Sequence, residues 1–467
     1  MNNITVKDLI RIMKGNLIIG DPRLPVKRIS INTRTMERGD FFLALRGKHY
    51  DGHDFLPVTL EKGAAGLIIS RLSKDFGKNP INYRQFPTII QVDNPLEALQ
   101  NFAKAYRKQF VALVIGITGS NGKTTTKEIL STILGQFDRC LYNQGNYNNH
   151  IGLPLTLLNL EQDHRFVIVE MGASAMGDIK KLAVIAEPKI GIITNIAPAH
   201  LETFGGIKNI FKTKMELLYS LPEDGEAIVN EDDPWLRELD KELRCRVTTY
   251  GLRSSSDVYV ENPIFWPNAS FQMMIQGTPY QVNLMYGGQY NVYNALAAAA
   301  AAWRIGIAPE AIADRLNKSS LPPMRNEVLI TKTNGVLVND AYNANPLSMR
   351  ASLECFVKSY PGKKKIAVLG DMLELGSYAV EEHKNLGKFL ASLPLDLIML
   401  FGEYRYHICD AARKEGVASN KLRCYDIRSY IIEDLVRMVN ASSAVLFKAS
   451  HSMGFDKIAD QVYKGIK

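Results

Sequence analysis

Residues 111–125 read VALVIGITGSNGKTT, and this stretch decides the fold. It begins with a continuous apolar run, which is typical of a strand buried on both faces of a parallel sheet. A glycine-rich turn follows, and a helical pattern begins near Thr125. Strand, loop and helix in this order present backbone N–H groups and a helix N-terminus to phosphate groups. The stretch therefore predicts an ATP site in an α/β domain.

The polar residues of this loop have predictable roles toward a triphosphate. Lys123 is expected to reach the β- and γ-phosphates, and Thr124 to offer its hydroxyl to Mg²⁺. The strict Walker spacing is not met, because Ile117 stands where the first glycine belongs. Gly119 and Gly122 can still close a shorter loop on a triphosphate. The alternative is a plain glycine-rich turn without a ligand.

Two residues at the ends of later apolar runs are candidate metal ligands. Glu170 ends one run and His200 follows the next, so both side chains are expected at the carboxyl edge of the sheet. The alternatives are an exposed strand-end glutamate and a loop histidine without a ligand. Lys214 lies in a helical segment at 207–218, where it is a solvated lysine unless burial makes its amine partly neutral.

Outward from this stretch the chain divides into three parts. Short strands with Gly, Pro and Asp turns occupy residues 1–92. Residues 93–320 repeat buried strands and helices, the rhythm of a doubly wound domain, and residues 321–467 repeat it after a Leu-Pro-Pro break. We predict an α/β protein with a smaller N-terminal α/β domain, a central doubly wound mononucleotide-binding domain and a Rossmann-like C-terminal domain. The predicted strands are 40–45, 66–70, 111–117, 166–170, 190–196, 227–230, 335–340, 365–370, 397–402 and 444–448, and the predicted helices include 96–109 and 290–305.

The composition is that of an ordinary globular protein. The 467 residues are 46% apolar and 22% charged, which excludes a mostly disordered chain, a collagen-like fibre and a coiled-coil rod. The net charge is +8, but the basic residues are spread along the chain without an arginine-rich arm. Small anionic substrates account for this charge, and we predict no nucleic-acid partner.

Cysteine usage and hydropathy predict a cytoplasmic protein. The five cysteines are widely spaced and form no CxxC pair, which favours a reducing compartment. The N-terminal residues lack the regions of a signal peptide. The longest uncharged apolar run, 295–303, is far below the roughly 20 residues of a membrane span. We predict no membrane span and a monomer.

Motifs in all three predicted domains point to one family. They are Thr118–Thr125, Gly145–Leu158, Thr194–Gly205, Asp340–Met349 and Leu369–Gly376. Together they resemble the ATP-dependent Mur ligases of peptidoglycan synthesis. They are most similar to the branch that joins D-alanyl-D-alanine to UDP-N-acetylmuramoyl-tripeptide. The resemblance implies that the tripeptide carboxylate attacks ATP to give an acyl phosphate, from which the dipeptide amine then displaces phosphate.

The resemblance also implies a role for each candidate site residue. Thr124 and Glu170 would hold one Mg²⁺, His200 would bind a second metal ion, and Lys214 falls where the family carries a carbamylated lysine. The implied catalytic residues are Lys123, His200, Lys214 and Arg325. The implied ATP-binding residues are Thr118, Gly119, Ser120, Asn121, Gly122, Lys123, Thr124, Asn294 at the adenine, Arg325 at the γ-phosphate and Asp340 near the ribose. The implied substrate-binding residues are Ser30, Thr33, Arg34, Asp51, Gly52, His53, Asn148, Asn149, Asn343 and Asn345.

Some positions depart from the family pattern, and other functions remain open. Asn32 stands where Asp is frequent, Tyr290 where His is common, and Lys448–His451 reads KASH where KGSR is usual. Asn294 has the alternative of a helix-surface amide, and Arg325 of a linker salt bridge. The alternative functions are MurE-like addition, folylpolyglutamate-type ligation, a P-loop switch or transport ATPase, and a silent scaffold that binds a UDP precursor.

Overall fold

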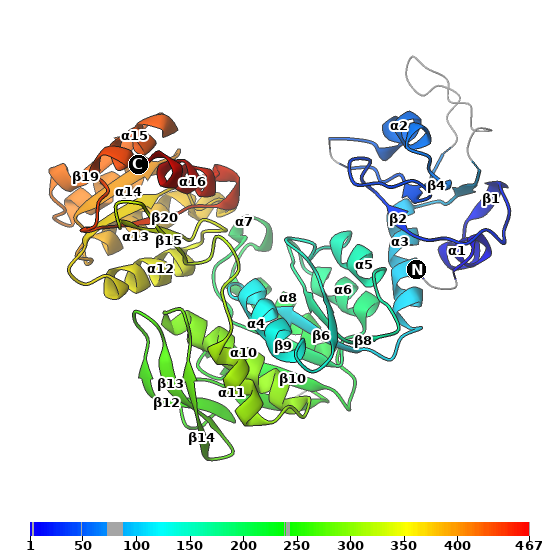
Figure 1. Ribbon diagram of the computed structural model, residues 1–467, viewed down its shortest axis with the longest axis horizontal. Helices are drawn as coiled ribbons and strands as arrows, with labels where there is room; N and C mark the ends of the chain where they lie inside the picture. The colour runs from blue at the N-terminus through cyan, green and yellow to red at the C-terminus, as the bar shows by residue number, and fades with distance from the viewer. Residues whose placement is uncertain (2–3, 48, 72–86, 238, 240–242, 467) are drawn as a thin grey trace. The chain divides into compact units, whose positions relative to one another are not determined.

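Apolar strands and amphipathic helices alternate along this chain, and both bury their apolar faces when they pack in layers. The layers form around three sheets. The computed structural model describes residues 1, 4–47, 49–71, 87–237, 239 and 243–466 (Figure 1). They form two compact units. The first unit is Met1–Gly116, Asp138–Gly172 and Asp178–Lys189, and the second is Ile117–Phe137, Ala173–Gly177 and Ile190–Lys467.

The N-terminal sheet of the first unit has the strand order β1-β5-β4-β3-β2. Strands β2 to β5 are parallel, and β1 pairs with β5 in the antiparallel direction. Phe42, Leu67 and Ile89 are cross-strand neighbours that share the buried face of this sheet. The elements are α1 (Val6–Met13), β1 (Asn16–Ile19), β2 (Ile29–Ser30), β3 (Phe41–Leu43), the 3₁₀ turn η1 (Gly52–Phe55), α2 (Leu56–Glu61), β4 (Gly66–Ile69) and β5 (Ile89–Gln91).

The first unit also holds part of the largest sheet, with the order β6-β8-β7. Helix α3 begins at Pro95 because the Asn94 side chain accepts hydrogen bonds from the N–H groups of Leu96 and Glu97. Strand β6 passes from the first unit into the second after Gly116. The elements are α3 (Pro95–Arg107), β6 (Leu113–Thr118), β7 (Arg139–Tyr142), α5 (Gly152–Leu157), β8 (His164–Glu170) and α6 (Asp178–Ala186).

The second unit continues from β6 with the strand order β14-β13-β12-β11-β10-β9. Strands β9 to β12 are parallel, and β12, β13 and β14 form an antiparallel meander. The alanine-rich helix α10 packs against α4, because its small buried side chains allow close approach. The elements are α4 (Lys123–Leu134), β9 (Ile190–Ile193), α7 (Leu201–Phe204), α8 (Ile207–Tyr219), β10 (Glu226–Asn230), α9 (Pro234–Arg237), β11 (Arg246–Tyr250), β12 (Val258–Ile264), β13 (Ser270–Ile275), β14 (Thr278–Asn283), α10 (Gln289–Arg304) and α11 (Pro309–Asn317).

The C-terminal sheet has the order β15-β16-β20-β17-β18-β19 and is parallel except for β15. Helices α15 and α16 cover one face and α12 to α14 the other, as in a Rossmann-like domain (Figure 1). The elements are β15 (Glu327–Ile330), β16 (Val336–Asn339), α12 (Pro346–Ser359), β17 (Lys364–Leu369), η3 (Gly376–Tyr378), α13 (Ala379–Leu390), β18 (Leu397–Phe401), α14 (Arg405–Lys414), η4 (Ser419–Lys421), β19 (Leu422–Tyr425), α15 (Arg428–Met438), β20 (Ser443–Lys448), η5 (His451–Met453) and α16 (Phe455–Gly465).

The predicted α/β class with three sheet-containing domains is confirmed, and every strand predicted from an apolar run is present. Several ends differ. Val111 is fully exposed and precedes the strand, and the helix after the loop begins at Lys123 because Gly122 caps it. The boundaries after residues 92 and 320 stay predictions. Within the described ranges, every helix is too short or too polar to cross a bilayer.

Candidate active site

The loop between β6 and α4 requires glycine at two positions. Gly119 and Gly122 have φ values of +146° and +84°. A β-carbon at Gly119 would lie 1.9 Å from Thr194 Oγ1, and one at Gly122 would lie 2.2 Å from Asn294 Oδ1. Both distances are shorter than any contact that real β-carbons make. The loop can therefore pack against Thr194 and Asn294 only because residues 119 and 122 are glycines without a β-carbon.

The segment after β9 holds the loop in this conformation. Ser120 N–H donates to the Asn195 carbonyl (2.9 Å), and Asn121 N–H donates to Asn195 Oδ1 (3.0 Å). In return Asn195 Nδ2 and Thr194 Oγ1 donate to the Asn121 carbonyl, at 3.0 and 2.5 Å. Thr194 and Asn195 belong to the motif at 194–205, but the sequence predicted no role for them. Their signal was the polar pair directly after a buried strand.

Lys123 and Thr124 stand in the first turn of α4, at the positive end of the helix dipole. The Lys123 ammonium donates to the carbonyls of Gly119 (2.9 Å) and Ser120 (3.4 Å). The Thr124 hydroxyl accepts a hydrogen bond from Arg325 Nη2 at 3.0 Å. Both predicted residues therefore lie where the loop meets α4. The guanidinium of Arg325, from the third domain, donates to the Thr124 hydroxyl.

Arg325 is held between the phosphate loop and the third domain. Its guanidinium carbon lies 4.2 Å from the centre of the Tyr342 ring, and within the described residues its Nε is buried without a hydrogen-bond partner. The contacts to a hydroxyl and a ring do not fit the alternative of a linker salt bridge. An unsatisfied guanidinium N–H beside a phosphate loop fits an anionic ligand.

The loop that follows β16 joins the third domain to the phosphate loop. Asn345 caps α12 by accepting the Ser348 N–H (2.9 Å), as Asn345-Pro346 predicts, and donates to Asn121 Oδ1 at 2.7 Å. Asp340 pairs with Lys448 Nζ at 2.6 Å, and the same ammonium donates to the Asn343 carbonyl at 3.1 Å. The lysine of the altered Lys448–His451 segment therefore shapes this loop.

His200 pairs with a carboxylate of the third domain. Its Nδ1 contacts Glu374 Oε2, and the hydrogen bond from His200 holds the pKa of the Glu374 carboxyl below its usual value. In the part of the chain that the structure describes, His200 Nε2 has no partner. Glu374 belongs to the motif at 369–376, but the sequence predicted no function for it.

Two residues with surface alternatives are buried instead. Lys214 is 5% exposed on the inner face of α8, so the solvated-lysine alternative is wrong. Asn294 is also 5% exposed, accepts a hydrogen bond from Thr126 Oγ1 at 3.4 Å and lies under Gly122. The helix-surface alternative for Asn294 is therefore wrong as well, whereas its predicted contact with adenine stays a prediction.

Glu170 belongs to the first unit and is described there by itself. It ends β8, is 3% exposed, and accepts a hydrogen bond from Asn148 Nδ2 at 2.8 Å. Asn143 pairs with its backbone N–H and carbonyl at 2.9 and 3.0 Å. Asn149 accepts the N–H groups of Ile151 and Gly152. The loop is thus ordered around the carboxylate, and a metal ion shared with Thr124 stays a prediction.

The predicted uridine-diphosphate residues lie in the first unit in two groups. Ser30 and Asn32 line a cavity of about 340 Å³ together with Arg28, Tyr147 and Leu155. The Ser30 hydroxyl donates to the Asn32 carbonyl at 3.2 Å. The cavity is lined both by the N-terminal sheet region and by the motif at 145–158, the predicted substrate loop, so a ligand bound there would contact both.

The second group surrounds a buried histidine. His53 Nδ1 contacts Asp51 Oδ1 at 2.6 Å, and its Nε2 accepts the Ser70 N–H at 3.2 Å. Burial opposes the charged form of Asp51, but hydrogen bonds from His53 and the charge of Arg71 hold the pKa of its carboxyl below its usual value. A β-carbon at Gly52 would lie 2.8 Å from the backbone of Leu45. This arrangement shapes the loop, and direct substrate contacts of these residues, Thr33 and Arg34 stay predictions.

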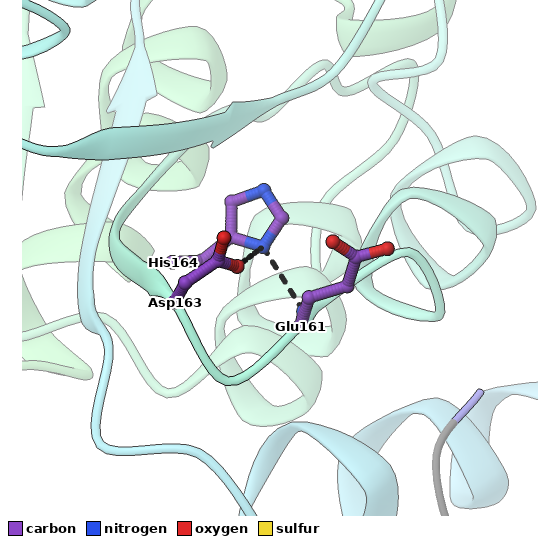
Figure 2. A group of neighbouring side chains, drawn as sticks. All are labelled: Glu161, Asp163 and His164. Carbon is purple, nitrogen blue, oxygen red and sulfur yellow. Dashed lines mark hydrogen bonds and ion pairs between the residues drawn. The ribbon is translucent and has the colours of Figure 1, made fainter.

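Figure 2 shows another group of potential metal ligands, Glu161, Asp163 and His164. Arg139 Nη1 contacts Glu161 Oε2 at 2.5 Å and Asp163 Oδ2 at 2.7 Å, so one guanidinium pairs with both carboxylates. His164 Nδ1 accepts the Glu161 N–H at 3.0 Å. The ligand atoms of this group are therefore already used by the chain.

The donors around the phosphate loop fit a divalent cation better. The Thr124 hydroxyl lies in the first turn of α4, and His200 combines a carboxylate partner on Nδ1 with an Nε2 that has no partner among the described residues. Metal-binding histidines usually donate their other ring N–H to a carboxylate in this way. A hydroxyl and an imidazole are ordinary ligands for catalytic divalent ions.

Three family profiles match the chain in sequence order. "Mur ligase family, catalytic domain" matches residues 25–107, "Mur ligase middle domain" matches 117–302, and "Mur ligase, glutamate ligase domain" matches 324–451. A UDP-N-acetylmuramoyl-tripeptide–D-alanyl-D-alanine ligase of Bacillus subtilis (strain 168) is 34% identical over 457 residues, which is 97% of each chain. The ligase of the same name from Escherichia coli (strain K12) is 31% identical over 88% of this chain and 89% of its own.

Solved structures agree over nearly the whole length. A crystal structure of MurF from Acinetobacter baumannii superimposes with a TM-score of 0.87 at 29% identity, and it covers 98% of both chains. The structure of MurF ligase from Thermotoga maritima in complex with ADP has a TM-score of 0.81 at 30% identity, covering 94% of this chain and 98% of its own.

Proposed function

This chain belongs to the Mur ligase family, and we propose that it joins D-alanyl-D-alanine to UDP-N-acetylmuramoyl-tripeptide at the expense of ATP. The products are the UDP-muramoyl-pentapeptide of peptidoglycan synthesis, ADP and phosphate. The observation that carries the proposal is the contact of Arg325 and Asn345, both from the third domain, with Thr124 and Asn121 of the phosphate loop. A ligase that must protect an acyl phosphate from water requires this closure of one domain on another.

The chain binds the adenine nucleotide through the loop between β6 and α4. The backbone N–H groups of the loop and the start of α4 receive the phosphates, and Lys123 leaves its present carbonyl partners to reach them. Arg325 supplies a permanently charged planar donor for the γ-phosphate. Together they stabilise the charge that develops while the tripeptide carboxylate attacks.

We propose that Thr124, Glu170 and His200 hold Mg²⁺, in two ions. When bound, these ions neutralise phosphate charge and orient the triphosphate. Lys214 is buried, and we propose that it is carbamylated, since a carbamate turns a buried cation into an anion that suits a site between two cations. Its burial supports this proposal, because a buried lysine is costly in its charged form.

The two substrates are assigned to different parts of the chain. The cavity beside Ser30 and Tyr147 and the ordered substrate loop around Asn148 support binding of the UDP-precursor by the first unit. Asn343 and Asn345 lie in the loop of the third domain that we propose meets the dipeptide. We further propose a monomer that acts in the cytoplasm, which agrees with five free cysteine thiols.

A coupled phosphate-release assay tests the proposal. The purified chain is incubated with ATP, Mg²⁺ and UDP-N-acetylmuramoyl-tripeptide, with and without D-alanyl-D-alanine, and the product is weighed by mass spectrometry. We expect phosphate release that depends on both substrates and one pentapeptide formed per phosphate. Phosphate release without the dipeptide would favour a plain ATPase, and addition of a single amino acid to a UDP-muramoyl dipeptide would favour MurE-like activity.

A further inference from the structure

Glu374 and His200 come from different domains and meet through their side chains. Glu374 lies in the loop between β17 and η3, and His200 lies directly before α7. The carboxylate of Glu374 contacts His200 Nδ1, so a neutral His200 ring with its proton on Nδ1 has its lone pair on Nε2. The ring is 38% exposed, which leaves Nε2 accessible to a ligand.

Both residues have backbone conformations that most side chains avoid. His200 and Glu374 have φ values of +53° and +63°. A non-glycine residue in this region is strained and persists only where its surroundings determine it. Here Glu202 N–H donates to the Glu374 carbonyl at 3.3 Å, and a β-carbon at Gly376 would lie 3.0 Å from Glu202 Cα. The segment that carries Glu374 therefore contacts α7, the short helix that follows His200, through its backbone.

The loop that carries Glu374 is anchored within its own domain. Met372 N–H donates to Nε2 of the fully buried His383 at 3.0 Å, and Leu373 N–H donates to Ser450 Oγ at 2.9 Å. Asp371 accepts the N–H groups of Glu403 and Tyr404 at 2.7 and 3.1 Å. The backbone of the loop that carries Glu374 thus has a fixed place on the third domain.

We infer that Glu374 is a positioning residue, which fixes the tautomer and ring orientation of His200 so that Nε2 faces a divalent cation at the nucleotide site. This inference rests on the proposed function for the assignment of His200 as a metal ligand. Its consequence is that the third domain completes a metal site whose other donors belong to the central domain. The affinity for the cation therefore depends on the contact between Glu374 of the third domain and His200 of the central domain.

Binding of Mn²⁺ to the full chain tests the inference without relying on turnover. Free Mn²⁺ is measured by electron paramagnetic resonance in the presence of a non-hydrolysable ATP analogue, for the wild type, Glu374→Ala, Glu374→Gln and His200→Ala. Loss of a carboxylate partner of a metal-binding histidine weakens metal affinity by about 10–100-fold. We expect about 10-fold weaker binding at one site in Glu374→Ala and a smaller change in Glu374→Gln. The double variant Glu374→Ala/His200→Ala should bind Mn²⁺ no more weakly than His200→Ala alone.

Glu381→Ala is the matched control, because Glu381 is an exposed glutamate of the same domain, 62% exposed against 62% for Glu374. It should bind Mn²⁺ like the wild type. Wild-type affinity in Glu374→Ala together with weakened affinity in His200→Ala would overturn the inference, as would wild-type affinity in both. Absence of pentapeptide synthesis by the wild type would instead contradict the proposed function, and the Mn²⁺ titration would still decide the role of Glu374.

Discussion

Two histidine–carboxylate groups of this chain differ in what they leave available. In the first unit, Glu161 and Asp163 share Arg139, and His164 Nδ1 accepts a backbone N–H. In the second unit, His200 has one carboxylate on Nδ1, and no described residue contacts its Nε2.

The comparison shows that closeness of ligand atoms is a poor guide to a metal site. The first group has its ligand atoms within 4.8 Å of one another, yet the chain itself already satisfies them. The second group is divided between two domains, and His200 Nε2 has no partner within the part of the chain that the structure describes. What separates the two is the number of lone pairs that the fold leaves unused.

The largest difference in kcat is expected between the alanine variants of His200 and His164. His200→Ala should lower kcat about 1,000-fold, the upper range for loss of one preorganised electrostatic group, with little change in Tm. His164→Ala should leave kcat unchanged and lower the stability by about 1–3 kcal/mol, because a buried side chain and the partner of the Glu161 N–H are lost. Steady-state kinetics and thermal unfolding of both variants measure this, and equal kcat values would break the comparison.

Lys214 tests whether a buried cation has become an anion. Lys214→Ala should lower kcat by about 100-fold or more. A short carboxylic acid such as acetate should restore part of the rate by supplying the carboxylate that the carbamate provided. Exposed Lys212→Ala on the same helix is the control and should keep wild-type kcat with no response to acetate. No rescue of Lys214→Ala at any acetate concentration would count against the carbamate.

Arg325 tests whether the third-domain cation acts by geometry or by charge alone. Arg325→Lys keeps the charge but loses the planar fork and the contact with Tyr342, so we expect kcat/KM to fall about 10–100-fold. Arg350→Lys is the control, since Arg350 lies 5.0 Å over the Phe389 ring in the same domain. If both variants keep wild-type kcat/KM, the bidentate role of Arg325 is wrong.

A third histidine sharpens the comparison through pH. His383 is fully buried, accepts the Met372 N–H and donates to the Ala379 carbonyl, and burial lowers its pKa despite the nearby charge of Asp371. It is neutral in the fold, so the unfolded chain takes up a proton first as the pH falls. The stability contributed by neutral His383 is present above about pH 6.5 and decreases below it. Urea unfolding between pH 7.5 and 5.5 should show a steeper decrease for the wild type than for His383→Gln.

The smallest effect is expected at Arg139. Arg139→Gln should leave kcat unchanged and lower Tm only slightly, because exposed ion pairs contribute little. It should, however, create weak Mn²⁺ binding at the freed acids, which the wild type lacks there. Electron paramagnetic resonance of free Mn²⁺ checks this. Unchanged Mn²⁺ binding would show that Arg139 is not what prevents Glu161 and Asp163 from binding a cation.

Local sequence patterns predicted the strands and the phosphate loop because both depend on neighbours in the chain. The apolar run before Gly119 and the Asn345-Pro346 cap needed no tertiary information. Glu374 and Asn195 could not be found in this way, since their partners, His200 and Asn121, are distant in sequence or depend on the loop conformation. The surface alternatives for Lys214 failed because burial on a helix depends on what packs against that face.

Transfer of ¹⁸O tests the central claim most directly. UDP-N-acetylmuramoyl-tripeptide labelled with ¹⁸O in its terminal carboxylate is converted with ATP and D-alanyl-D-alanine, and the released phosphate is analysed by mass spectrometry. Attack of this carboxylate on the γ-phosphate, followed by displacement by the amine, leaves one carboxylate oxygen on phosphorus. We predict one ¹⁸O in each phosphate released from fully labelled substrate. Unlabelled phosphate, formed while the pentapeptide accumulates, would contradict an acyl-phosphate ligase.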